Sequence, residues 1–149
     1  MDMKPELYLE DFEVGDAFEF GNHTFTADGI VSFAEQYDPQ RPHLGHERAA
    51  ETAFGELVAS GLHTFCVCCQ LSVDALFART AVLAGAGFDR VRFLEPVRPG
   101  DVLTGRATVE RVEPADDHPG GYVDVEIVGT NQDGDIVLSC LDLALVESR

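Results

Sequence analysis

The most informative stretch of this sequence reads Tyr37-Asp38-Pro39-Gln40-Arg41-Pro42-His43-Leu44. Its two prolines fix the backbone φ angle and remove amide donors, so the segment cannot continue a helix. We therefore expect a stiff turn with Asp38 and His43 at its two ends. A carboxylate and an imidazole held in this way can share one water molecule and move its proton. The alternative is structural, with Asp38 closing the turn and His43 an ordinary loop histidine.

The segments before this turn predict a strand and then a helix. Residues 17–25 alternate phenylalanine with polar residues over much of their length, which is typical of a strand. Thr26 can then cap a helix whose apolar residues recur at three- and four-residue steps up to Tyr37. Such a helix delivers Asp38 to its carboxyl end, where Pro39 stops it.

The segments after the turn predict two helices and a sheet. Residues 47–54 contain helix formers, residues 56–60 are irregular or a short strand, and residues 61–83 are the longest helical run. That run is apolar on most faces in its first half, so we expect it to be buried. Four strands are then predicted, with an Asp-Gly hairpin signal before the last; they cover residues 87–94, 102–113, 121–131 and 136–146. The pattern predicts an α+β fold with antiparallel strands.

Length and hydropathy predict one domain that covers residues 1–149. A chain of 149 residues with 45% hydrophobic residues can bury a substantial core. It has no apolar run of about 18 residues, so no membrane span is expected. The start of the sequence lacks the basic and apolar regions of a secretion signal, and we therefore expect a cytoplasmic protein.

Charge and cysteine usage exclude other classes of function. The formal net charge is -17, with 27 acidic against 10 basic residues, and such a surface repels nucleic acid and anionic membranes. The four cysteines lack the paired spacing of a zinc site, and no histidine completes one. We expect them to be buried, reduced thiols, and we expect no metal; they are Cys66, Cys68, Cys69 and Cys140.

Three motifs, taken in order, resemble the MaoC-like dehydratases, the (R)-specific enoyl-CoA hydratase family of hot-dog proteins. The first is the turn, which in the family has a common form close to Asp-Pro-Gln-Pro-Phe-His-Leu-Asp. The second is Ala59-Ser60-Gly61 at the start of the long helix. The third is Arg92-Phe93-Leu94-Glu95-Pro96-Val97-Arg98-Pro99-Gly100-Asp101. The resemblance spans residues 9–146 and implies a single hot-dog domain, in which an antiparallel sheet of about five strands wraps a long central helix.

The resemblance also implies roles for particular residues. Asp38 and His43 would bind the water that adds to an enoyl double bond. Either of the two residues could be the base that takes the proton of the water. The backbone N–H of Gly61 would stabilise the oxyanion of the thioester, or this glycine would only permit tight packing. Ser60 would assist nearby or act as the N-cap of the helix. Arg41 stands where the family usually has proline, and it could contact the substrate or alter the pKa of Asp38.

Two arginines of the third motif are candidates for binding the phosphates of coenzyme A. Arg92 and Arg98 could supply positive charge against the acidic background, or they could simply pair with neighbouring carboxylates. Two further histidines lie near the motifs. We expect His63 to pack inside the long helix and His46 to face solvent.

The function implied by the resemblance is a hydro-lyase that interconverts trans-2-enoyl-CoA and (R)-3-hydroxyacyl-CoA. It would need neither a metal nor a redox cofactor, with the CoA thioester as substrate, and it would act as a homodimer. Two alternatives stay open. One is a hot-dog acyl-CoA thioesterase, which releases free thiol, and the other is a non-catalytic protein that binds acyl thioesters.

Overall fold

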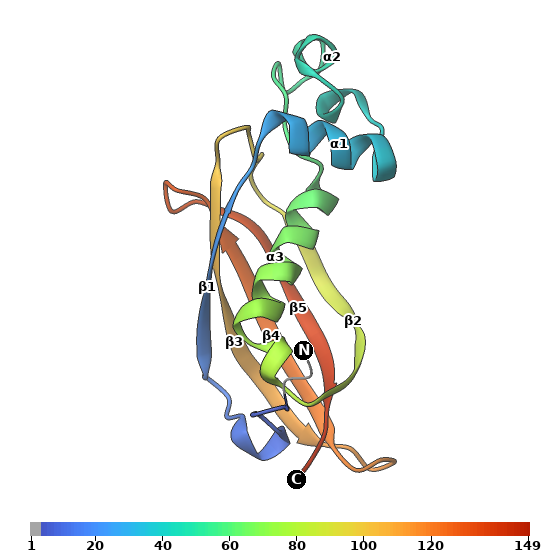
Figure 1. Ribbon diagram of the computed structural model, residues 1–149, viewed down its shortest axis with the longest axis vertical. Coiled ribbons are helices and arrows are strands. Elements are labelled where there is room, and N and C mark those ends of the chain that lie inside the picture. The colour runs from blue at the N-terminus through green and yellow to red at the C-terminus, as the bar shows by residue number, and fades with distance from the viewer. Residues whose placement is uncertain (1–3) are drawn as a thin grey trace.

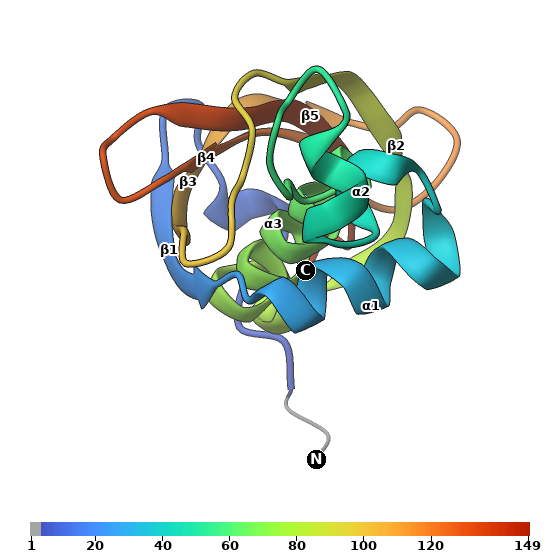
Figure 2. The same ribbon diagram turned by 90° about the horizontal axis from the view of Figure 1, so that it is seen from above.

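A long helix lies against the concave face of one antiparallel sheet in the computed structural model, which describes residues 4–149 (Figure 1). The helix is α3, Gly61–Ala75. The sheet has the strand order β1-β3-β4-β5-β2. Its strands are β1 (Ala17–Thr24), β2 (Val82–Phe93), β3 (Val102–Pro114), β4 (Gly121–Thr130) and β5 (Ile136–Val146). Seen from above, the sheet curves around α3 (Figure 2). This is the expected α+β hot-dog arrangement, which is confirmed.

The remaining helices are short and, for the most part, gather at the end of the sheet where α3 begins (Figures 1 and 2). There α1 is followed by the short helix η2 and by α2, which together carry the turn and its surroundings. The other two 3₁₀ helices, η1 and η3, lie elsewhere along the chain. The bounds are η1 (Leu9–Asp11), α1 (Ala27–Tyr37), η2 (Arg41–His43), α2 (His46–Ala50) and η3 (Phe77–Arg79).

Helix α3 is buried on the side that faces the sheet. Ser60 caps it, since its hydroxyl accepts a hydrogen bond from the N–H of Leu62 at 3.2 Å. The helix approaches the sheet closely at Gly129 of β4, where a Cβ atom would lie 2.7 Å from the sulfur of Cys68. This glycine therefore fixes how deeply α3 can sit in the sheet. The buried residues of α3 are Thr64, Val67, Cys68, Leu71 and Ser72.

Two predicted helix boundaries are wrong. The run predicted over residues 61–83 is helical only to Ala75; it continues through η3 and enters β2 at Val82, five residues before the predicted start of that strand. The reason is pairing with β5, where Val82 lies opposite Val146. The helix predicted over residues 47–54 is the shorter α2, and residues 56–60 form no regular element.

The predicted bounds of the other elements are close to those observed. The strands at the carboxyl-terminal half start at the expected residues, and the hairpin between β4 and β5 turns at Gly134, whose φ is +83°. No helix in the described part of the chain has the length and hydropathy needed to cross a membrane.

The cysteines follow the prediction only in part. All four are free, but Cys66 is exposed and Cys69 is half-buried, because α3 is covered by the sheet on one side only. Burial raises the pKa of both Cys68 and Cys69 to about 12. These two thiols are therefore neutral at physiological pH.

One edge of the sheet is unusually open. Strand β2 has β5 on one side and no strand on the other, and most of its residues are exposed. Large apolar side chains are among them; Val82, Leu83, Phe88 and Phe93 are each between 39% and 54% exposed. An unpaired strand with exposed apolar residues is a surface that proteins ordinarily cover.

Candidate active site

The turn between α1 and α2 has the expected form. Helix α1 ends at Tyr37, and the N–H of Asp38 makes the last helical bond to the carbonyl of Ala34 at 2.9 Å. The chain then bends, with the N–H of Gln40 bonded to the carbonyl of Asp38 at 2.7 Å, and one turn of 3₁₀ helix carries it to His43. Both side chains of the pair point back toward the start of α3, as their contacts with residues 58 and 60 show.

The carboxylate of Asp38 is held by two hydrogen bonds. The hydroxyl of Ser60 donates to Oδ2 at 2.6 Å, and the amide of Gln40 donates to Oδ1 at 2.6 Å. The hydrogen bond from Ser60, followed by that from Gln40, lowers the pKa of Asp38 below its ordinary value. Because both bonds favour the charged form, Asp38 is ionised at neutral pH.

The imidazole of His43 is oriented from its other side. Nδ1 lies 2.7 Å from the carbonyl oxygen of Val58, and since a carbonyl can only accept, Nδ1 carries the proton. In the neutral ring this leaves an unshared electron pair on Nε2. That nitrogen lies 3.6 Å from Oδ2 of Asp38, too far for a direct hydrogen bond. The side chains of Asp38 and His43 are 16% and 12% exposed, so a water molecule between them would have few other partners.

The residues at the start of α3 complete the site. Ser60 is fully buried and caps the helix at Leu62, as predicted, and its hydroxyl also donates to Asp38. Gly61 follows as the first helical residue, a position whose N–H has no acceptor inside the helix. A Cβ atom at Gly61 would lie 2.4 Å from the ring of Phe93, so only glycine fits beneath that ring.

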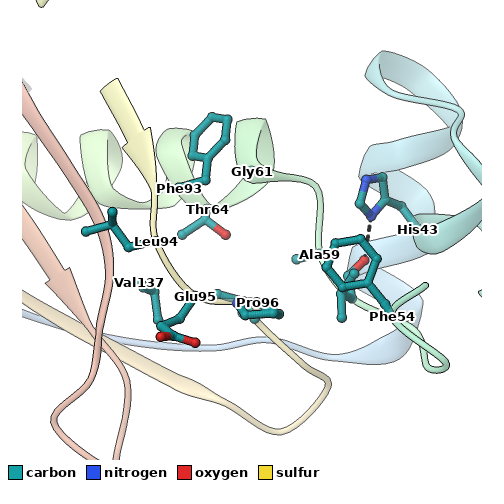
Figure 3. Close-up of a pocket in the computed structure, with 12 residues that line it drawn as sticks. His43, Phe54, Ala59, Gly61, Thr64, Phe93, Leu94, Glu95, Pro96 and Val137 are labelled. Atoms are coloured by element: carbon teal, nitrogen blue, oxygen red, sulfur yellow. Dashed lines mark hydrogen bonds between the residues drawn. The ribbon is translucent and has the colours of Figure 1, made fainter. Parts of the chain in front are cut away.

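A pocket of about 320 Å³ opens beside His43 (Figure 3). His43 and Phe54 lie at one side of this view, while Leu94, Glu95 and Val137 lie at the other. Most of the wall is apolar, and the remaining lining residues are Val58, Ala59, Gly61, Thr64, Phe93, Pro96 and Val97. A mostly apolar cavity with a few polar groups is typical of a site for a small molecule with an apolar part.

The three candidate arginines lie outside this pocket lining. Arg41 pairs with Glu51 at 2.5 Å, and Arg98 pairs with Glu56. Arg92 bonds to a backbone carbonyl of its own strand and lines a different hollow, which it shares with Arg90. None of the three lines the pocket beside His43. Phosphate binding by Arg92 and Arg98, and contact of Arg41 with the substrate, stay predictions.

The two additional histidines lie apart from the pocket lining. His46 is exposed at the start of α2, as predicted. His63 stacks on Phe33 of α1 with ring centroids 4.7 Å apart, and its edge contacts Phe25. Burial, with a smaller effect from His23, lowers the pKa of His63. His63 therefore packs α1 against α3, as the sequence predicted.

Sequence reasoning missed several parts of the site. Gln40 lies inside the quoted turn, so its contact with Asp38 was within reach. The carbonyl of Val58 and the ring of Phe93 leave no signal in the sequence, since their roles depend on packing. Within residues 4–149, no three His, Cys, Asp or Glu side chains are grouped so that they could hold a metal ion.

Comparison with known proteins agrees with this geometry. The family described as "MaoC like domain" matches residues 11–130, which include the turn and the start of α3. The chain belongs to this family. Among MaoC-like relatives of known structure, a MaoC-like dehydratase from Rhodospirillum rubrum is 34% identical with a TM-score of 0.86, covering 96% of this chain and 98% of its own.

Other relatives agree in fold or in part of the sequence. An (R)-hydratase, PhaJ1 from Pseudomonas aeruginosa, shares the fold with a TM-score of 0.73 at 22% identity, covering 96% of this chain and 87% of its own. Protein MaoC of Klebsiella aerogenes is 36% identical over 105 residues, which are 70% of this chain and 31% of that protein. The chain thus matches less than a third of that longer relative.

Proposed function

We propose that this MaoC-like protein hydrates trans-2-enoyl-CoA thioesters to (R)-3-hydroxyacyl-CoA thioesters and catalyses the reverse dehydration. The observation that carries the proposal is the 3.6 Å separation between Nε2 of His43 and Oδ2 of Asp38, beside a mostly apolar pocket. This separation suits two acceptors that hold one water molecule between them. Membership of a family that includes dehydratases supports it.

Asp38 and His43 have different roles toward the water molecule. Asp38 is kept ionised by its two donors and is a weak base, so it orients the water by accepting one of its hydrogen bonds. His43 takes the other proton of the water at Nε2, since its Nδ1–H is already committed to Val58. The water oxygen forms its bond to C3 of the enoyl group. The resulting imidazolium is stabilised by the neighbouring carboxylate.

Proton return completes the addition. When the C3–O bond forms, the electron pair of the double bond moves onto the thioester oxygen. Gly61 lines the pocket as the first residue of α3, and its N–H, which has no helical acceptor, would stabilise that charge. His43 then gives its proton to C2, and the electron pair returns from oxygen to carbon. The overall change is the addition of one water across the double bond, and both residues end in their starting state.

We also propose that the working form is a homodimer that pairs the open edges of two β2 strands. Exposed apolar residues along β2, with Phe93 and Leu94 of the pocket wall at its end, support this assembly. Light scattering after gel filtration at micromolar concentration should give twice the mass of the 149-residue chain. A monomer mass would contradict this part of the proposal.

The function is tested by following the absorbance of the enoyl thioester after mixing the protein with crotonyl-CoA and with longer enoyl-CoAs. We expect rapid loss with the wild type, an (R)-configured product, and a rate about a hundredfold lower in both Asp38→Asn and His43→Ala. Arg149→Ala, which breaks an ion pair with Asp11 away from the pocket lining, is the control and should keep most of the activity.

The product separates this function from its alternatives. Release of free thiol without hydroxyacyl-CoA would mean a thioesterase. Tight binding of acyl-CoA without turnover, unchanged in Asp38→Asn, would mean a binding protein and would refute the proposal.

A further inference from the structure

Thr64 carries a buried hydroxyl that faces the candidate active site. It lies in the first full turn of α3, its residue is only 3% exposed, and it lines the pocket beside His43. Figure 3 shows its hydroxyl oxygen on the side of the side chain that faces Ala59 and His43, at the centre of the lining residues. A polar group in this position meets whatever molecule fills the pocket.

The hydroxyl has no partner among residues 4–149. A threonine inside a helix ordinarily bonds back to a carbonyl three or four residues earlier. Two other buried hydroxyls do so: Ser72 donates to the carbonyl of Cys69 at 2.8 Å, and Thr80 donates to that of Leu76 at 2.9 Å. Thr64 makes no such bond, although the carbonyl of Ser60 lies one turn away and accepts from its N–H at 3.2 Å. A hydroxyl that lines the pocket without a partner in the described chain is available to a ligand or a water molecule.

Its spacing from Gly61 defines what that ligand atom could be. Residues three apart on a helix lie on one face, and both Gly61 and Thr64 line the same pocket. Each offers one donor without an acceptor in the helix: the backbone N–H of Gly61 and the hydroxyl of Thr64. Two donors on the wall of one pocket could both reach a single oxyanion.

We propose that Thr64 is a second oxyanion donor, which acts with Gly61 on the carbonyl oxygen of the thioester. This inference rests on the proposed hydratase function. As the water adds to C3, negative charge appears on the thioester oxygen, and the hydroxyl of Thr64 strengthens its hydrogen bond to that oxygen. The hydroxyl keeps its proton throughout. When His43 protonates C2, the charge leaves the oxygen and the bond weakens again.

The charged environment of the site makes hydrogen-bond donors on the pocket wall important. Glu95 lines the same pocket and Asp38 is ionised nearby, so the enolate forms in a region of negative potential. The three arginines expected from the sequence lie outside the lining and cannot offset that charge directly. Short, fixed hydrogen bonds from Gly61 and Thr64 then carry the stabilisation.

The test uses Thr64→Val, which keeps the shape but removes the hydroxyl, and Thr64→Ser, which keeps the hydroxyl. Thr80→Val is the matched control, since Thr80 is a buried threonine whose hydroxyl bonds to the backbone. We expect the kcat of Thr64→Val for crotonyl-CoA to fall about a hundredfold. Thr64→Ser and Thr80→Val should stay within a few fold of the wild type.

Binding separates an oxyanion donor from a structural hydroxyl. The saturated analogue butyryl-CoA forms no enolate, so calorimetry should give nearly the same Kd for Thr64→Val as for the wild type. An unchanged kcat in Thr64→Val would overturn the inference, as would a loss of butyryl-CoA affinity equal to the loss in kcat/KM. A folded wild type without hydratase activity would remove the proposed function as well, whereas an active wild type with an active Thr64→Val variant would remove this inference alone.

Discussion

Asp142 on β5 offers a test of how burial acts in this fold. It pairs with Val125 on one side and Phe88 on the other, and burial raises its pKa from the ordinary 3.8 to about 6. Burial is the sole cause, because no neighbouring positive charge offsets it. The folded protein therefore binds a proton at Asp142 more tightly than the unfolded chain does. Its contribution to stability is fully present below pH 3.8 and is lost as the pH rises through about 6.

The size of this effect follows from the pKa. A rise from 3.8 to about 6 corresponds to about 3 kcal/mol of lost stability once both forms are ionised. Because the side chain is only partly buried, we expect about 2 kcal/mol after allowing for solvent screening. Asp142→Asn keeps the shape and carries no charge. It should therefore be about 2 kcal/mol more stable than the wild type at pH 8, and the difference should largely vanish at pH 4.

Urea unfolding at the two pH values measures this difference directly. Asp116→Asn is the control, since Asp116 is exposed in the loop between β3 and β4 and its removal should change stability little at either pH. The reasoning is refuted if Asp142→Asn is less stable than the wild type at pH 8. A gain of the same size at pH 4 and pH 8 would equally show that ionisation is not the cause.

Two further predictions follow from close contacts of glycines, and a third follows from the burial of His63. Gly61→Ala places a methyl group 2.4 Å from the ring of Phe93, so kcat/KM for crotonyl-CoA should fall at least tenfold while circular dichroism stays that of a folded protein; wild-type activity would contradict this. Gly129→Ala sets a methyl group 2.7 Å from the sulfur of Cys68 and should cost about 1–3 kcal/mol in urea unfolding, because α3 must move outward. His63 has a lowered pKa, so its neutral form is favoured in the fold and wild-type stability is lost as the pH falls below 6.5. His63→Phe keeps an aromatic ring in the stack, and its Tm should fall less than that of the wild type between pH 8 and pH 5; an equal fall would exclude His63 as the source.

Local patterns predicted those elements whose signals lie within one segment. Helix α1 and strands β3 to β5 have caps, alternation and turn residues of their own, and their bounds were close. The boundary between α3 and β2 was not predictable in this way. Residues 76–83 form a mostly apolar run that suits a buried helix or a strand, and pairing with β5 decides between them.

In the candidate site, too, contacts within one segment were predictable and contacts between distant segments were not. Asp38 and His43 lie five positions apart on one rigid turn, so the sequence could place them together. The bond from His43 to the carbonyl of Val58 joins segments 15 residues apart, and it depends on how the chain packs at the start of α3. The resemblance left Arg98 either to bind phosphate or to pair with a neighbouring carboxylate, and in the structure Arg98 pairs with Glu56, as Arg41 does with Glu51.

The hydroxyl oxygen of Ser60 takes part both in the start of α3 and in the hydrogen bonding of Asp38. It begins α3 by accepting from Leu62 and keeps Asp38 ionised by donating to it. The acidity of Asp38 therefore depends on the position of the central helix that packs against the sheet (Figure 1). A core substitution far from the pocket that shifts α3 would weaken the bond from Ser60 and raise the pKa of Asp38 while the protein stays folded. Attempts to stabilise the core should be judged by the pH–rate profile as well as by the melting temperature.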